Sequence, residues 1–195
     1  MLRRLSTLGL AALLGFVPAF SGDSPAQPQQ QFPVFRGPER LLADTLVVAA
    51  DDFVVDVYHN GVKIPDDRRE LVVEVFGATV ERIKVDVRPG DWLVFNVVND
   101  RMRWGGAAYF GVSGRAPTGL GFTTGLDSGR WSCCDDLGQV GQFIADRNRF
   151  ADHRALPIAK PWPDGDSLMA QHVDGWNGKP VWGGSRNTWI KFIAR

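Results

Sequence analysis

The chain has 195 residues, and its 22 basic and 22 acidic side chains leave no net charge at neutral pH, so the composition gives no reason to expect a nucleic-acid partner. Hydrophobic residues make up 44% of the chain, which is enough to build a core that needs no stabilising disulfide or metal ion. Composition therefore predicts one ordinary globular domain after the N-terminal segments described next.

The first 21 residues have the order of features found in a secretory signal peptide. Arg3 and Arg4 precede an apolar run over residues 8–20, and a polar stretch follows Ser21. This run of about 13 residues is too short to span a bilayer core of roughly 30 Å as a helix. We therefore expect export to the periplasm or the extracellular space, with no transmembrane segment after cleavage. A buried N-terminal helix is the alternative.

Residues 22–44 are rich in proline and glutamine and predict a linker, because such a segment buries too little apolar surface to offset its chain entropy. Residues 45–195 then form the folded domain. Near-continuous apolar runs at residues 53–58, 71–76 and 92–98 predict strands that are covered on both faces.

Residues 80–87 predict a half-buried strand, because Ile83, Val85 and Val87 alternate with Arg82, Lys84 and Asp86. Further short strands are expected at residues 107–112 and 188–193. Asn60-Gly61 predicts the turn of a β-hairpin, and Pro89-Gly90 predicts a second turn. The expected fold is all-β, an antiparallel β-sandwich of jelly-roll type with a long loop-rich segment at residues 113–187.

Four stretches of this sequence carry a resemblance: ADDFVVDVYHNG (residues 50–61), VRPGDWLVFNVVN (87–99), GGAAYFGVSG (105–114) and the closing VWGGSRNTWIKFIAR. Together they resemble the galactose-binding-like jelly roll of secreted lectin-like and carbohydrate-binding modules. The resemblance implies a carbohydrate ligand. It also implies that acidic residues at Asp51 and Asp52 lie near a bound calcium ion or a sugar hydroxyl.

Oxygen-donating side chains that could hold calcium occur at two places, Asp51 with Asp52 and Asp164 with Asp166. The structural alternative is that these aspartates cap turns, as aspartates commonly do without any metal. Asp135 and Asp136 are further oxygen donors on a predicted loop.

Several of the seven tryptophans lie outside the predicted strands, and aromatic rings beside polar groups suit the apolar faces of sugars. The alternative is that these rings attach the loop-rich segment to the sandwich. The candidate ligand-binding residues are Trp104, Trp131, Trp162, Trp176 and Asn177.

The two cysteines, Cys133 and Cys134, are adjacent, and three states are open to them: a strained vicinal disulfide, a bond between chains, or two buried thiols. The sequence contains neither a GxSxG nor an HExxH motif. We therefore expect a secreted, non-catalytic binding module for carbohydrate, assisted by calcium or by no cofactor. The alternatives are a structural or adhesive cell-envelope protein that binds another protein and, third, a glycan hydrolase.

Overall fold

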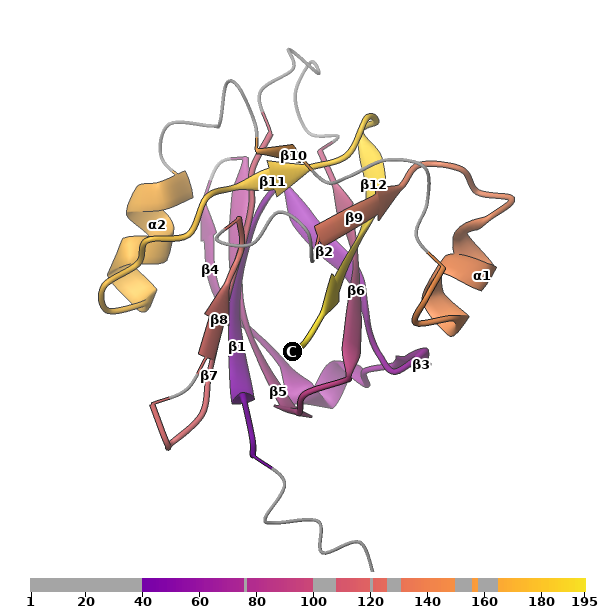
Figure 1. The fold of residues 1–195 in the computed structure, drawn as a ribbon. Helices are drawn as coiled ribbons and strands as arrows, with labels where there is room; N and C mark the ends of the chain where they lie inside the picture. The colour runs from indigo at the N-terminus through magenta and orange to yellow at the C-terminus, as the bar shows by residue number, and fades with distance from the viewer. Residues whose placement is uncertain are drawn as a thin grey trace, which may run out of the picture. The chain divides into compact units, whose positions relative to one another are not determined.

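The computed structural model describes residues 40–75, 77–99, 108–119, 121–125, 131–149, 156–157 and 165–195. Two antiparallel sheets of five strands each pack face to face (Figure 1). This arrangement confirms the predicted antiparallel β-sandwich. The signal peptide predicted at residues 1–21 lies outside the described residues, and β1 begins at Ala43, within the predicted linker.

The first sheet has the strand order β4-β5-β1-β7-β8, so β1 is its central strand. Its register is set on one side by pairing of β1 with β5 and on the other by pairing of β1 with β7. The bounds are β1 Ala43–Asp51, β4 Arg69–Val75, β5 Ala78–Val87, β7 Phe110–Arg115 and β8 Gly121–Thr123.

The second sheet has the order β3-β2-β6-β12-β9, with β6 at its centre. The last strand, β12, lies between β6 and β9, so the C-terminal strand is held on both sides. The bounds are β2 Phe53–His59, β3 Val62–Lys63, β6 Trp92–Val98, β9 Trp131–Cys134 and β12 Asn187–Ile193.

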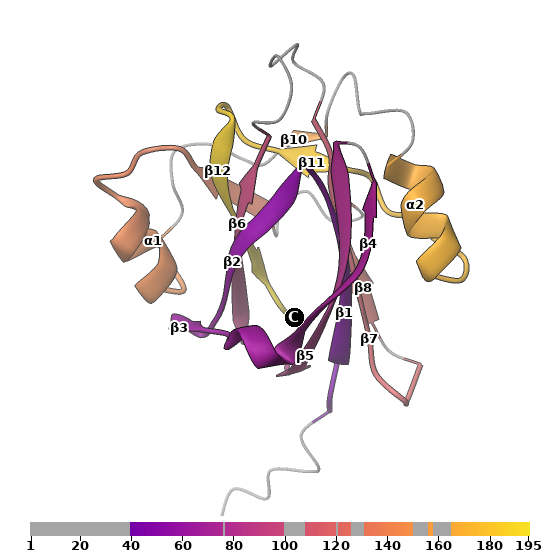
Figure 2. The same ribbon diagram turned by 180° about the vertical axis from the view of Figure 1, so that it is seen from behind.

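The remaining described elements are short. A 3-10 helix, η1 (Asp66–Arg68), lies between β3 and β4, and strands β10 (Leu156–Pro157) and β11 (Val181–Trp182) pair with each other. Two α-helices, α1 (Val140–Ala145) and α2 (Gly165–His172), lie on opposite outer sides of the sandwich, as Figure 2 shows from behind. No helix in the described part of the chain is long and apolar enough to cross a membrane.

The stretch ADDFVVDVYHNG contains both a hairpin and a change of sheet. The predicted hairpin is confirmed: β2 and β3 pair around Asn60 and Gly61, whose φ angles of 52° and 80° suit a type I′ turn. Before it, β1 ends at Asp51 in the first sheet and β2 begins at Phe53 in the second. Asp52 makes this corner with a φ of 61°, and its backbone N–H donates to the Gly77 carbonyl.

The second predicted turn is also present. Like the corner at Asp52, it joins the two sheets. Pro89 and Gly90 occupy its centre, Gly90 has a φ of 97°, and the Asp91 N–H donates to the Arg88 carbonyl at 3.1 Å. This is the geometry of a type II turn, which requires a positive φ at its third residue. The turn carries the chain from β5 to β6 and thus from one sheet to the other.

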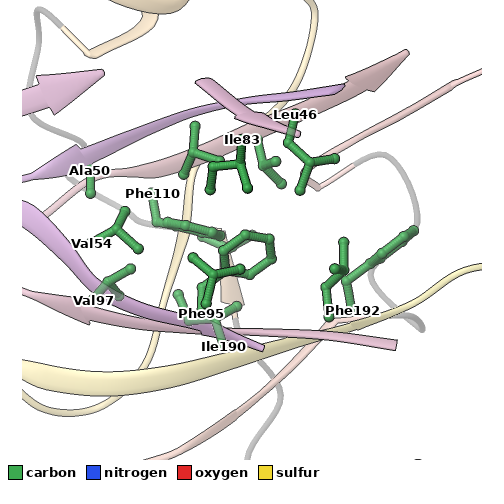
Figure 3. Packing of buried hydrophobic residues seen from close by; sticks show 14 of the residues in the cluster. Leu46, Ala50, Val54, Ile83, Phe95, Val97, Phe110, Ile190 and Phe192 are labelled. Atoms are coloured by element: carbon green, nitrogen blue, oxygen red, sulfur yellow. The ribbon is translucent and has the colours of Figure 1, made fainter. Parts of the chain in front are cut away.

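The core lies between the sheets and contains the inward side chains of both (Figure 3). Phe95 of β6 and Phe110 of β7 meet across the sandwich with their ring centroids 5.1 Å apart. The predicted alternation in β5 is confirmed, because Ile83, Val85 and Val87 belong to this core. The core therefore depends on the two-residue periodicity of the strands.

The prediction that residues 71–76 are covered on both faces is wrong for the described part of that strand. β4 is an edge strand, and Leu71 and Val75 are 56% and 38% exposed. By contrast, the prediction holds for β6, whose residues from Leu93 to Val97 are all buried. The apolar runs look alike in sequence, but only β6 lies between two long strands.

Helix α1 packs on the outer face of the second sheet. A buried lysine of that sheet contacts the end of the helix. Lys191 of β12 donates to the carbonyls of Asp146 and Arg149 at 2.8 and 2.7 Å, and its ammonium group lies 4.1 Å from the Phe143 ring centroid. These contacts cap the C-terminal end of α1 with a positive charge. Burial lowers the pKa of Lys191 to about 8.

Truncating Phe95 should destabilise the protein far more than truncating Leu71. Phe95 is fully buried between the sheets, so Phe95→Ala should lower the free energy of unfolding by about 3–5 kcal/mol. Leu71→Ala, at the exposed edge, should cost less than about 0.5 kcal/mol. Urea denaturation measures both changes, and similar losses in the two variants would contradict the described core.

Candidate functional site

Helix α2 covers part of the outer face of the first sheet. Leu168, Met169 and Val173 pack against a small apolar cluster that includes Ala49 of β1 and Val80 of β5. These strand residues point away from the main core, because neighbouring residues in a strand face opposite sides. The first sheet is therefore buried on both faces where α2 lies.

A polar network attaches α2 to the sheet. The Tyr109 hydroxyl donates to Asp166 Oδ1 at 2.9 Å, and the Trp176 indole N–H donates to the same oxygen at 3.0 Å. Burial, together with the Asp166 charge, raises the pKa of Tyr109 well above its ordinary value. The buried hydroxyl therefore stays protonated and keeps its hydrogen bond.

Glycines make room for the two aromatic rings of this network. A Cβ at Gly111 would lie 3.0 Å from the Tyr109 hydroxyl and 3.3 Å from the Trp176 ring. At Gly165 a Cβ would overlap the Tyr109 ring, and at Gly178 it would overlap the Trp176 ring. Only glycine lets both rings lie this close to the backbone.

A cavity of about 360 Å³ lies on the same outer face, next to the C-terminal end of α2. Thr45 and Val47 of β1 pair with Arg115 and Ser113 of β7, which brings these four side chains to one face of the sheet. The segment after α2 forms the opposite wall. The residues that line the cavity are Asp44, Thr45, Val47, Ser113, Arg115, Ala116, Pro117, His172, Val173 and Asp174.

The cavity wall combines hydrogen-bond donors and acceptors with apolar surface. Arg115 donates to the backbone carbonyl of Asp174 and so links β7 to the segment after α2. The Nε2 atom of His172 is buried and has no hydrogen-bond partner within the described residues. Asp44 and Asp174 add two carboxylates. This mixture suits a small polar ligand with an apolar side.

Three of the predicted site residues lie on or after α2, and none of them lines this cavity. Asp166 and Trp176 belong to the network that holds α2, and Asn177 is exposed next to Trp176. The Trp176 ring lies against Gly111, which is two residues along β7 from the cavity residue Ser113, or roughly 7 Å. The structure thus brings an aspartate and a tryptophan from the loop-rich segment together, in a network that also positions the cavity wall.

The other predicted ligand-binding residues lie elsewhere. Trp131 is on β9 with only 2% of its surface exposed, and its ring packs against Phe110 and Phe192 in the core. In this position it has no free face for a sugar. Trp104, Trp162 and the predicted calcium ligand Asp164 lie outside the described residues.

Asp51 and Asp52, the first predicted calcium pair, are both buried at the corner between the sheets. Asp51 Oδ2 accepts a hydrogen bond from the Asn99 amide at 2.7 Å. Burial, reinforced by the charge of Asp52, raises the pKa of Asp51 to about 6. Within the described residues, no group of three or more acidic, histidine or cysteine side chains could hold a metal ion. Calcium binding stays a prediction.

The adjacent cysteines are both buried and form no disulfide. Because they are neighbours on a strand, Cys133 faces the main core, whereas Cys134 faces the cluster under α1. Burial raises the pKa of Cys133 to about 12, and it raises the pKa of Cys134 as well. Thiols with raised pKa values form little nucleophilic thiolate at neutral pH.

Sequence reasoning missed most of the cavity. Asp44 lies in the segment predicted to be a linker, and Arg115 and His172 lie in the segment predicted to be loop-rich. The polar residues Ser113 and Arg115 are two positions apart on one strand, which indicates a polar site on one face of the sheet. Finding their partners on β1 requires the register of a strand pair whose members are more than 60 residues apart.

The comparisons with known proteins do not add to this geometry. No protein-family model, no curated protein and no solved structure matches the chain. The function is therefore argued from the site itself.

Tyr109 and Asp166 should be energetically coupled, because removing the carboxylate leaves a buried hydroxyl without its partner. We expect Tyr109→Phe and Asp166→Ala to show a coupling energy of about 1–3 kcal/mol in a double-mutant cycle measured by urea denaturation. Tyr109→Phe combined with Asp136→Ala, in the segment before α1, should be additive. Additivity in the first cycle would show that the network does not hold α2.

Asp51 should make the protein less stable as the pH rises from about 4 to 6. Its pKa is higher in the folded state than the ordinary aspartate value of 3.8, so the folded state binds the proton more tightly and loses that advantage as the carboxyl ionises. Asp51→Asn should therefore be more stable than the wild type by about 1–2 kcal/mol at pH 7 and similar to it at pH 4. Thermal or urea unfolding across this range measures the difference.

Asp67→Asn is the matched control for this titration, because Asp67 is exposed in η1. Both variants remove one carboxylate, so a difference between them in how stability changes from pH 4 to pH 7 reflects the buried environment of Asp51. An equal change in the two variants would contradict the described environment of Asp51.

Proposed function

We propose that this protein is an exported, non-catalytic binding module for carbohydrate and that the cavity between β1, β7 and the segment after α2 is its ligand site. The observation that carries the proposal is the presence in one cavity of both donor and acceptor side chains, Arg115 and His172 on one hand and Asp44 and Asp174 on the other. Sugar hydroxyls both donate and accept hydrogen bonds, so they match such a wall.

The apolar part of the wall supports the same class of ligand. Val47, Val173 and Pro117 offer contact to the C–H face of a sugar ring. A volume of about 360 Å³ accommodates a small ligand such as one or two sugar rings. The resemblance of the predicted strands to the galactose-binding-like jelly roll points to the same ligand class, and the predicted signal peptide is consistent with a function outside the cytoplasm.

Two competing functions remain as outcomes of the test. The exposed edge strand β4, with Leu71 and Val75, favours the alternative of an adhesive envelope protein that binds another protein. A glycan hydrolase requires two placed carboxylates, and Asp44 and Asp174 line one cavity. A hydrolase would release product from some glycan in a substrate panel, which a binding module would not.

Removing the charge of Arg115 should weaken glycan binding. We expect the wild-type protein to bind a subset of glycans on an array, and we expect Arg115→Gln to bind the best of them at least tenfold more weakly by calorimetry. The matched control is Arg147→Gln, an exposed arginine after α1. Binding of no glycan, or equal binding by Arg115→Gln and the wild type, would overturn the proposal.

The same assay with a chelator tests the calcium prediction. If calcium assists binding, the affinity should fall when EDTA is added and return when calcium is restored. An affinity that EDTA leaves unchanged would remove calcium from the proposal and leave the carbohydrate site intact.

A further inference from the structure

A second cavity, of about 230 Å³, lies where the chain crosses from β3 in the second sheet to β4 in the first. Its apolar lining comes from this crossing segment and from β5, and its polar lining is entirely basic. The lining residues are His59, Val62, Lys63, Ile64, Pro65, Arg68, Lys84 and Val85. We call this cavity the basic pocket.

The basic residues that line the pocket come from four different elements. His59 ends β2, Lys63 ends β3, Arg68 ends η1 and Lys84 lies on β5. No aspartate or glutamate is among the lining residues of this pocket. Asp66 and Asp67 precede Arg68 in η1 but are not among the lining residues.

Two of the four basic groups already have acidic partners. Lys63 forms an ion pair with Asp56 at 2.5 Å, and His59 Nε2 lies 3.0 Å from Asp91 Oδ2. Arg68 and Lys84, in contrast, have no ion pair within the described residues. The pocket therefore contains two cations whose charge is not neutralised by a neighbouring carboxylate in direct contact.

Two of the apolar residues that line the pocket are buried. Ile64 and Val85 are 5% and 6% exposed, and both belong to the main core. A charge held against such a surface is screened less than one that is fully surrounded by water. An anion in the pocket would therefore interact with Arg68 and Lys84 more strongly than an anion at a flat surface would.

We propose that the basic pocket binds an oxyanion group, a phosphate or sulfate carried by a polar ligand. The guanidinium group of Arg68 can donate two parallel hydrogen bonds to such a group, and the ammonium group of Lys84 adds a second positive charge. The apolar wall accommodates the part of the ligand that carries the oxyanion. This site is separate from the proposed carbohydrate cavity, so either can fail without the other.

The test is a titration of the full-length protein with inorganic pyrophosphate, followed by NMR of the backbone amides. We expect saturable shifts confined to residues 59–68 and 84–85. In Arg68→Gln/Lys84→Gln the affinity should fall at least tenfold, and in the single variant Lys84→Gln it should fall to an intermediate value. Both side chains are exposed, so these variants should keep the wild-type melting temperature.

The matched control is Arg147→Gln/Lys179→Gln, which removes one exposed arginine and one exposed lysine outside this pocket. It should bind pyrophosphate within twofold of the wild type. Equal weakening in both double variants, or shifts spread over all basic residues, would show general charge attraction and overturn the proposal.

A second titration identifies the source of the oxyanion. Dextran sulfate, with neutral dextran as its control, represents a sulfated glycan, and pyrophosphate represents a phosphorylated small molecule. Saturable binding in either titration that Arg68→Gln/Lys84→Gln weakens supports the proposal and indicates the source. Absence of saturable binding to both probes would overturn it.

Discussion

The central position of β1 in the first sheet is the constraint on which the rest of the structure depends. Its inward residues Leu46, Val48 and Ala50 belong to the main core, while its outward residues meet α2 or line the larger cavity. Its pairing with both β5 and β7 sets the register of the whole sheet. At Asp52 the same chain turns into the second sheet, so one segment connects both layers of the sandwich.

The outer faces of the sandwich are covered by helices too short to be stable alone, since isolated helices under about 12 residues are marginal in water. Each is held by a polar contact in addition to apolar packing. Asp166 receives the hydrogen bonds of Tyr109 and Trp176 at α2, and Lys191 donates to the carbonyls that follow α1. The polar groups of the loop-rich segment therefore position the helices, and α2 in turn positions the wall of the larger cavity.

Both cavities form where segments distant in sequence meet. The larger one combines β1, β7 and the residues after α2, and the basic pocket combines the ends of β2 and β3 with η1 and β5. Neither set of residues forms a motif along the chain. Their chemistry, mixed in the first cavity and basic in the second, appears only when the strands are paired.

The sequence alone determined what depends on neighbouring residues: the hairpin at Asn60-Gly61, the turn at Pro89-Gly90 and the alternation in β5. These features follow from backbone sterics and the two-residue period of a strand. The tertiary structure decided what depends on distant partners: that β4 is an edge strand, that Trp131 lies in the core, and that Arg115 meets the segment after α2. The local sequence of a strand does not specify which other strand pairs with it. The pairing decides whether a side chain is buried, exposed or part of a site.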